Sequence, residues 1–258
     1  MDIGKVVTSS SIGAGVTALG ERWVNAHPEG YHKGLYSETI QPFGECYFYD
    51  DFWTKLEVAT FWTLEDTGAA TELWSGTPGP GGWAELTLSG GAVETAGIDC
   101  GDVLCFSMDY GLQFETKAMP LVLPTATGEL WIGVANANVE TTIVGAGPTI
   151  HAFFVMDGSG IVTIFTDDGA VAGAHNNEAV ATGVTLTAGV GACFRIDFTD
   201  VTNVKFYING KRVAAGTTFN MNSAVVGRLV QPMLQAINFA ASVGTLSADY
   251  VRIWQERY

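Results

Sequence analysis

Short strand patterns separated by turn signals follow one another along most of this chain, at intervals of roughly 8–12 residues. Trp83–Leu88 alternates apolar and polar residues, as a half-buried strand does. His151–Met156 and Ile161–Thr166 are joined by Asp157–Gly160, whose sequence Asp-Gly-Ser-Gly predicts a β-hairpin. No long amphipathic helix pattern alternates with the strands, which excludes a parallel α/β sheet. The chain is therefore predicted to be all-β, as an antiparallel sandwich or barrel.

Further strands complete this set, and two more turns connect them. Asn209-Gly210 predicts a tight turn with positive φ at both residues, and Thr166–Gly169 is expected to form another turn. Val103–Met108 and Gly111–Thr116 are expected to pair with each other, and Asp249–Trp254 is expected to close the sandwich. These strands are Val103–Met108, Gly111–Thr116, Glu129–Ala135, Cys193–Phe198, Val204–Ile208, Leu229–Ile237 and Asp249–Trp254.

The first 43 residues differ from the rest of the chain. They are rich in Gly, Ser and loop signals, so they are predicted to form an irregular N-terminal arm. Residues 44–258 are predicted to form a single sandwich domain, because all-β domains often reach this size. The start of the chain carries no basic segment followed by an apolar one, so we expect a protein made in a bacterial cytosol without a signal peptide.

The charge distribution limits the partners that this protein can have. The formal net charge is −15, and Lys117 is the only Lys or Arg between Leu56 and Phe194. This long acidic section would repel a phosphate backbone or an anionic membrane surface, so we expect neither nucleic-acid nor membrane binding. The section from Arg195 onward is weakly basic and is a candidate contact surface for an acidic partner.

The four cysteines are Cys46, Cys100, Cys105 and Cys193. No Cys-x-x-Cys occurs, which excludes a zinc ribbon. Cys100 and Cys105 flank Gly-Asp-Val-Leu and could face each other across a bend, whereas the more ordinary interpretation is a set of free, buried thiols.

Three segments near the end of the chain carry a resemblance to a known fold. Arg195–Phe198, Val204–Val213 and Leu246–Trp254 form a strand, an Asn-Gly hairpin and a final Asp-Tyr-Val strand. This pattern resembles the concanavalin A-like lectin/glucanase (laminin-G-like) jelly-roll sandwiches. The resemblance implies a fold that is also used by lectins and by enzymes that cut β-glucans, so the fold alone does not determine the function.

A second resemblance is narrower. The segments that carry it are Gly82–Leu86, Gly111–Glu115, Leu130–Ala135 and Phe154–Gly160. They look like structural proteins of tailed bacteriophages, in which such sandwiches decorate the outside of the head. This resemblance implies a location on the virion surface and a major capsid protein as partner.

The motifs of catalysis are missing from the sequence. Glucanases of this fold carry closely spaced carboxylates, because residues two apart on a strand share a face, and no such run occurs. Asp197 and Asp200 are three apart, which places them on opposite faces of a regular strand. The Gly-x-Ser-x-Gly nucleophile motif is also absent. We therefore expect a protein that is not an enzyme and that needs no cofactor.

Two kinds of binding site remain open. A structural calcium ion could be held by Asp50, Asp51 and Asp249, because the first and last strands of such sandwiches are commonly neighbours. Trp62, Trp74 and Trp83 bracket a Gly- and Pro-rich loop and are candidates for stacking on a sugar, or else they pack in the core and at its rim.

Two functions follow from this interpretation. The first is a non-catalytic virion protein that decorates and stabilises a phage head. In that role the arm would contact the major capsid protein, and self-association of the protein is left open. The candidate capsid-contact residues are Val16, Leu19, Trp23, Tyr31 and Tyr36. The alternative function is a lectin-like carbohydrate-binding module, and a weak glycan contact is compatible with both functions.

Overall fold

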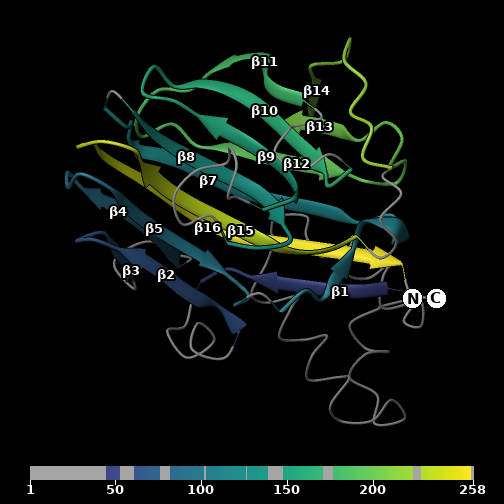
Figure 1. Cartoon of the computed structure of the whole chain (residues 1–258), viewed down its shortest axis with the longest axis horizontal. Helices are drawn as coiled ribbons and strands as arrows, with labels where there is room; N and C mark the ends of the chain where they lie inside the picture. The colour runs from purple at the N-terminus through teal and green to yellow at the C-terminus, as the bar shows by residue number, and fades with distance from the viewer. Residues whose placement is uncertain are drawn as a thin grey trace, which may run out of the picture. The chain divides into compact units, whose positions relative to one another are not determined.

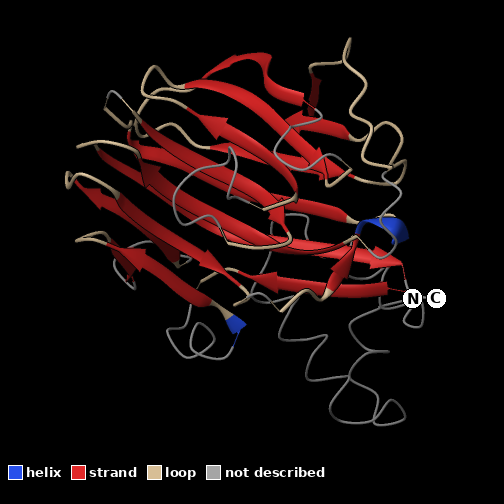
Figure 2. Cartoon of the chain, viewed as in Figure 1, coloured by secondary structure: helices blue, strands red, loops and turns tan. Residues whose placement is uncertain are grey.

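A computed structural model describes residues 45–52, 61–75, 82–101, 103–125, 127–138, 148–170, 177–222 and 228–256. Residues 46–256 form one compact unit. The described residues are almost entirely strands arranged in two antiparallel sheets (Figures 1 and 2), which confirms the predicted all-β sandwich. No helix in this part of the chain is long and apolar enough to cross a membrane. The predicted arm, residues 1–43, lies outside the described residues.

The first sheet, here called sheet A, contains eight strands. They are β1 (Glu45–Asp50), β3 (Thr71–Ser75), β4 (Trp83–Ser89), β7 (Gln113–Val122), β12 (Ala192–Asp197), β13 (Lys205–Ile208), β14 (Lys211–Val213) and β16 (Val243–Glu256). The strand order is β14-β13-β12-β7-β16-β4-β3, and β1 also pairs with β16. The long strand β16 therefore lies between β4 and β7 (Figure 1).

The second sheet, sheet B, also contains eight strands. They are β2 (Thr63–Thr67), β5 (Glu94–Asp99), β6 (Phe106–Ser107), β8 (Gly128–Ala135), β9 (Ile150–Met156), β10 (Ile161–Asp168), β11 (Asn177–Thr185) and β15 (Leu229–Asn238). The strand order is β11-β10-β9-β8-β15-β5-β2, with β6 beside β15. A short 3₁₀ helix, η1 (Met108–Tyr110), follows β6.

Aromatic side chains from both sheets meet in the core. Phe154 of β9 lies 5.1 Å from Phe194 of β12 and 5.3 Å from Phe206 of β13, measured between ring centroids. All three side chains are at most 1% exposed. Complete burial of one such side chain contributes about 1.5–3 kcal/mol relative to leaving it in water. These contacts hold sheet A against sheet B.

A second, smaller apolar cluster lies on the side of sheet B that faces away from this core. Leu130 and Ile132 of β8 point into the main core, so the alternate residue Trp131 points to the opposite side. It packs there with residues of β9 and β15. The buried members of this cluster are Trp131, Ala135, Phe153, Val155, Met233 and Ile237.

Both predicted hairpins with strong turn signals are present. Strands β9 and β10 pair antiparallel around Asp157, whose Oδ1 accepts from the backbone N of Ser159 at 2.8 Å and of Ile161 at 3.0 Å. Asn209 and Gly210 have φ of 52° and 73°, as a type I′ turn requires, and they join β13 to β14.

The other predicted turn, Thr166–Gly169, is wrong in its position. Strand β10 continues through Asp168, and the backbone reaches positive φ only at Gly169. Asp167 is 6% exposed and Asp168 is 4% exposed, so both are buried in the sheet. The pairing with β9 outweighs the turn preference of the two aspartates.

The predicted pairing of residues 103–108 with 111–116 is also wrong. The short strand β6 pairs with β15 in sheet B, whereas β7 pairs with β12 and β16 in sheet A. The 3₁₀ helix η1 lies between them and ends at Gly111, whose φ is 63°. Glycine adopts this left-handed backbone conformation at little steric cost because it has no Cβ atom, and the conformation turns the chain at this point. The segment is therefore a crossing between sheets.

Candidate functional site

The outer face of sheet A is the side that points away from the core. Phe114, Ile196 and Val251 point inward and are buried, so their neighbours along β7, β12 and β16 point outward. These neighbours are polar and aromatic, and most of them are half-buried. The outer face of sheet A is defined here as Trp83, Gln113, Glu115, Lys117, Arg195, Asp197, Tyr207, Tyr250, Arg252 and Trp254.

The strand register arranges these residues in rows across the sheet. In one row, Arg252 is opposite Glu115, and Glu115 is opposite Arg195. Arg195 is in turn opposite Tyr207. Directly opposed Cβ atoms in a sheet are about 4.5–5.5 Å apart, so each neighbour in the row can interact with the next. The order is cation, anion, cation, aromatic ring.

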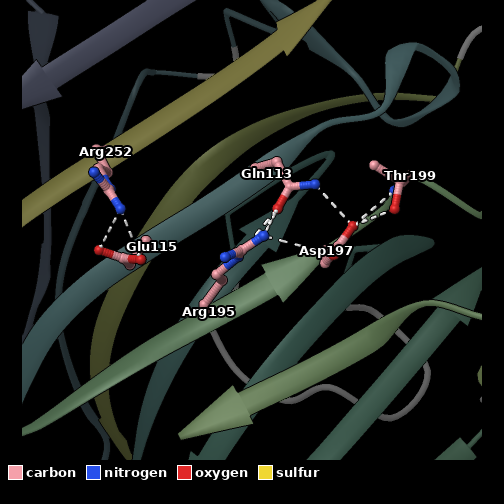
Figure 3. Close-up of polar contacts among 6 residues, drawn as sticks. All are labelled: Gln113, Glu115, Arg195, Asp197, Thr199 and Arg252. Atoms are coloured by element: carbon pink, nitrogen blue, oxygen red, sulfur yellow. Dashed lines mark hydrogen bonds and ion pairs between the residues drawn. The ribbon is translucent and has the colours of Figure 1, made fainter. Parts of the chain in front are cut away.

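Glu115 is the centre of the first group of contacts (Figure 3). Arg252 Nη2 lies 2.9 Å from each of the two carboxylate oxygens of Glu115. The Tyr250 hydroxyl donates to Oε1 of the same carboxylate at 2.7 Å. Burial raises the pKa of Tyr250, and the negative charge of Glu115 raises it further, so the phenol remains a donor.

Gln113 links the second group (Figure 3). Its Oε1 accepts from Arg195 Nη2 at 2.7 Å and from Nε at 3.1 Å, while its Nε2 donates to Asp197 Oδ1 at 2.7 Å. The backbone N and the hydroxyl of Thr199 also donate to Asp197 Oδ1. Every polar end of the Gln113 amide is thus engaged, which fixes its orientation.

The carboxylate of Asp197 is held in its ionised form. Burial acts to raise its pKa, but the hydrogen bonds from Thr199 and Gln113 and the nearby charge of Arg195 outweigh burial, so the pKa of Asp197 lies below its ordinary value. Hydrogen bonds to the charged form produce such a shift. Asp197 is therefore suited to accept hydrogen bonds near neutral pH and not to deliver a proton.

Aromatic rings surround the arginines. The Arg252 guanidinium lies 4.9 Å from the centroid of Trp254. Arg195 lies 5.9 Å from the same ring and 5.5 Å from the ring of Tyr207. Such cation–π contacts contribute about 0.5–1 kcal/mol each at exposed sites. The outer face of sheet A therefore combines flat apolar rings with oriented hydrogen-bonding groups.

The three predicted glycan-binding tryptophans do not lie together. Trp62 is 4% exposed, packs in the core, and donates from Nε1 to Asp50 Oδ2 at 2.6 Å. A ring buried in this way belongs to the core and offers no face to a sugar. Trp74 belongs to β3, but its side chain lies outside the described residues. Trp83 is on the outer face of sheet A, with Lys117 Nζ 5.8 Å from its ring centroid.

The predicted calcium ligands Asp50, Asp51 and Asp249 do not form a group of three that could hold a metal ion in the described part of the chain. Strand β1 does pair with β16, as the prediction required. However, Asp50 accepts from the backbone N of Phe52 at 2.7 Å and from Trp62, and Asp249 pairs with Lys117 at 2.7 Å.

Trp83 is the only residue of the outer face of sheet A among the predicted site residues. The strands that carry Arg195, Tyr207 and Trp254 were predicted, and their alternation already separates the outward residues from the inward ones. No local sequence signal predicts the strand order, which places β12 and β16 on either side of β7. The predicted capsid-contact residues all lie in the first 43 residues, outside the described part, so the virion role stays a prediction.

The chain matches no protein-family model and no curated protein. Solved structures are similar to it at the level of the fold. A protein of unknown function from Shewanella oneidensis MR-1 has a TM-score of 0.56 at 14% identity, over 83% of this chain and 87% of that one. The Emp46p carbohydrate recognition domain in its metal-free form has a TM-score of 0.51 at 12% identity, over 78% and 90%.

A third similar structure is that of an enzyme. A β-1,3-glucanase from Mycobacterium marinum has a TM-score of 0.50 at 14% identity, over 80% of this chain and 97% of that one. The chain has the concanavalin A-like lectin/glucanase sandwich fold. At these identities the similarity shows the fold alone, and both a sugar-recognition domain and a hydrolase share it.

Proposed function

We propose that this protein is a non-catalytic, lectin-like carbohydrate-binding domain and that the outer face of sheet A is its contact surface. The observation that carries the proposal is the grouping around Trp254. Its ring lies beside the guanidinium groups of Arg195 and Arg252, and Arg195 is hydrogen-bonded to Gln113. An aromatic ring beside oriented planar polar groups matches the apolar face and the hydroxyl edge of a sugar.

The hydrogen-bond network supports binding because it fixes these groups in advance. Gln113, Asp197 and Arg195 are each tied to another member of the set. Ordering a flexible side chain on binding costs about 0.5–1.5 kcal/mol, so groups that are already ordered leave more of the contact energy for affinity. The fold that the chain shares with the Emp46p carbohydrate recognition domain agrees with this function by analogy.

The charges on the face favour binding over hydrolysis. Glycoside hydrolysis needs a carboxylic acid whose pKa is raised, so that it can protonate the leaving oxygen, together with a second carboxylate. The pKa of Asp197 is lowered instead, and Glu115 is held by Arg252 and Tyr250. Neither Asp197 nor Glu115 is arranged as a general acid.

A glycan array followed by titration of the best glycan would test the proposal, with neutral and acidic glycans both included. We expect Trp254→Ala to weaken binding about tenfold, which corresponds to about 1.4 kcal/mol. Phe239→Ala is the matched control, because Phe239 is an exposed aromatic residue that is not part of the face. Equal affinity of wild type and Trp254→Ala, or no retention on any glycan, would overturn the proposal.

A further inference from the structure

The two cysteines at the junction of β5 and β6 are brought together by strand register. Ile98 is opposite Leu234 and Phe106 is opposite Val230, both on β15. Ile98 and Phe106 are eight positions apart, whereas their partners are only four apart. The chain therefore loops out between β5 and β6, and Cys100 and Cys105 stand at the two ends of that loop.

Backbone contacts hold this arrangement in place. Cys100 donates from its backbone N to Gln231 Oε1 at 3.0 Å, which fixes it beside β15. Val103 N donates to the carbonyl of Cys100 at 3.2 Å and closes a turn. Gly101 has a φ of 62° within this turn, a conformation that glycine adopts readily. The chain can thus return to β15 within a few residues.

The thiols of Cys100 and Cys105 each shift the pKa of the other, and neither cysteine is in a disulfide. Cys100 is buried and Cys105 is exposed. The hydrogen bond from Cys100 lowers the pKa of Cys105, although partial burial acts in the opposite direction. The same contact, together with burial, raises the pKa of Cys100. An exposed thiol with a lowered pKa next to a second thiol that can resolve it is the usual arrangement of a redox-active pair.

We propose that Cys100 and Cys105 form a reversible disulfide with low-molecular-weight disulfides such as oxidised glutathione. The thiolate of Cys105 attacks one glutathione sulfur, which gives a mixed disulfide and releases a glutathione thiolate. Cys100 then loses its proton and attacks Sγ of Cys105, which releases the second glutathione. Two protein thiols are oxidised to one disulfide, one glutathione disulfide is reduced to two thiols, and the two cysteine protons pass to the released thiolates.

Thiol labelling of the full-length protein would test this proposal. The folded protein is treated with oxidised glutathione, denatured, alkylated and analysed by peptide mass spectrometry. We expect Cys100 and Cys105 to lose alkylation together, with no glutathione retained, and to recover it after treatment with dithiothreitol. Alkylation of both cysteines after oxidation, or a stable mixed disulfide in the wild type, would overturn the proposal.

Single substitutions separate the two roles. Cys100→Ser should trap glutathione on Cys105, because the thiol that resolves the mixed disulfide is gone. Cys105→Ser should leave Cys100 fully alkylated. Cys193→Ser is the matched control, because Cys193 is a half-buried thiol hydrogen-bonded to Tyr250 and removed from the pair. It should leave the disulfide unaffected, and loss of the disulfide in this variant would also contradict the assignment.

Discussion

The outer face of sheet A is polar and half-buried, whereas the outer side of sheet B is buried and largely apolar at its central strands β8, β9 and β15. The difference is visible along single strands. All seven residues of β9 are buried, on both sides of the sheet, while the first four residues of β12 alternate between buried and half-buried. Sheet B thus contributes apolar packing on two sides, and sheet A contributes it on one. Substitutions on the two outer sides should therefore have different effects.

The largest loss of unfolding free energy is expected for a substitution on the outer side of sheet B. Phe153 is fully buried, and its ring centroid lies 5.6 Å from that of Trp131 and 5.3 Å from that of His151. Phe153→Ala should lower the free energy of unfolding by about 3–5 kcal/mol, because it leaves a cavity in a packed cluster. Urea unfolding followed by circular dichroism measures this. Tyr207→Ala on sheet A is the comparison, and an equal loss in the two variants would remove the distinction between the faces.

An intermediate loss of unfolding free energy is expected for a substitution of Asp197, and this loss should depend on pH. Because its pKa is lowered in the folded protein, its contribution to stability is present above the unfolded-state pKa of about 3.9 and is lost as the pH falls through the folded-state pKa. Asp197→Asn should cost about 1–3 kcal/mol at pH 7 and flatten the acid part of the stability profile. Asp66→Asn, at an exposed carboxylate, is the control. If the free energy of unfolding falls equally with decreasing pH in Asp197→Asn and wild type, the hydrogen bonds to Asp197 do not stabilise its ionised form.

The smallest effect is expected at the Lys117–Asp249 ion pair. The side chains of Lys117 and Asp249 are 49% and 22% exposed. Exposed pairs typically contribute less than about 1 kcal/mol and are screened by salt. Lys117→Ala should therefore change the free energy of unfolding by less than about 1 kcal/mol, and 1 M NaCl should abolish the difference. A loss comparable with that of Asp197→Asn would show that the pair is coupled to the rest of the face.

Strand positions were largely predictable from the sequence, and strand partners were not. The alternation at 83–88 and the Asn209-Gly210 turn are local signals, and the structure confirms both. Glu115 and Arg252 are far apart in the sequence, and nothing local indicates that their strands adjoin. The predicted pairing of residues 103–108 with 111–116 is wrong for the same reason. A short connection such as η1 can join two strands of one hairpin or two strands in different sheets, and the local sequence does not distinguish these cases.

The position of β16 between β4 and β7 has a consequence for how the protein folds. Before residues 243–256 emerge from the ribosome, β4 has only β3 as a native partner, β7 has only β12, and β1 has none, so sheet A exists as three separate pieces. Each piece then presents an open edge to other nascent chains. Pairings of such long sequence separation are slow to form. The interval before β16 arrives is therefore the stage of synthesis at which this sandwich is most exposed to aggregation.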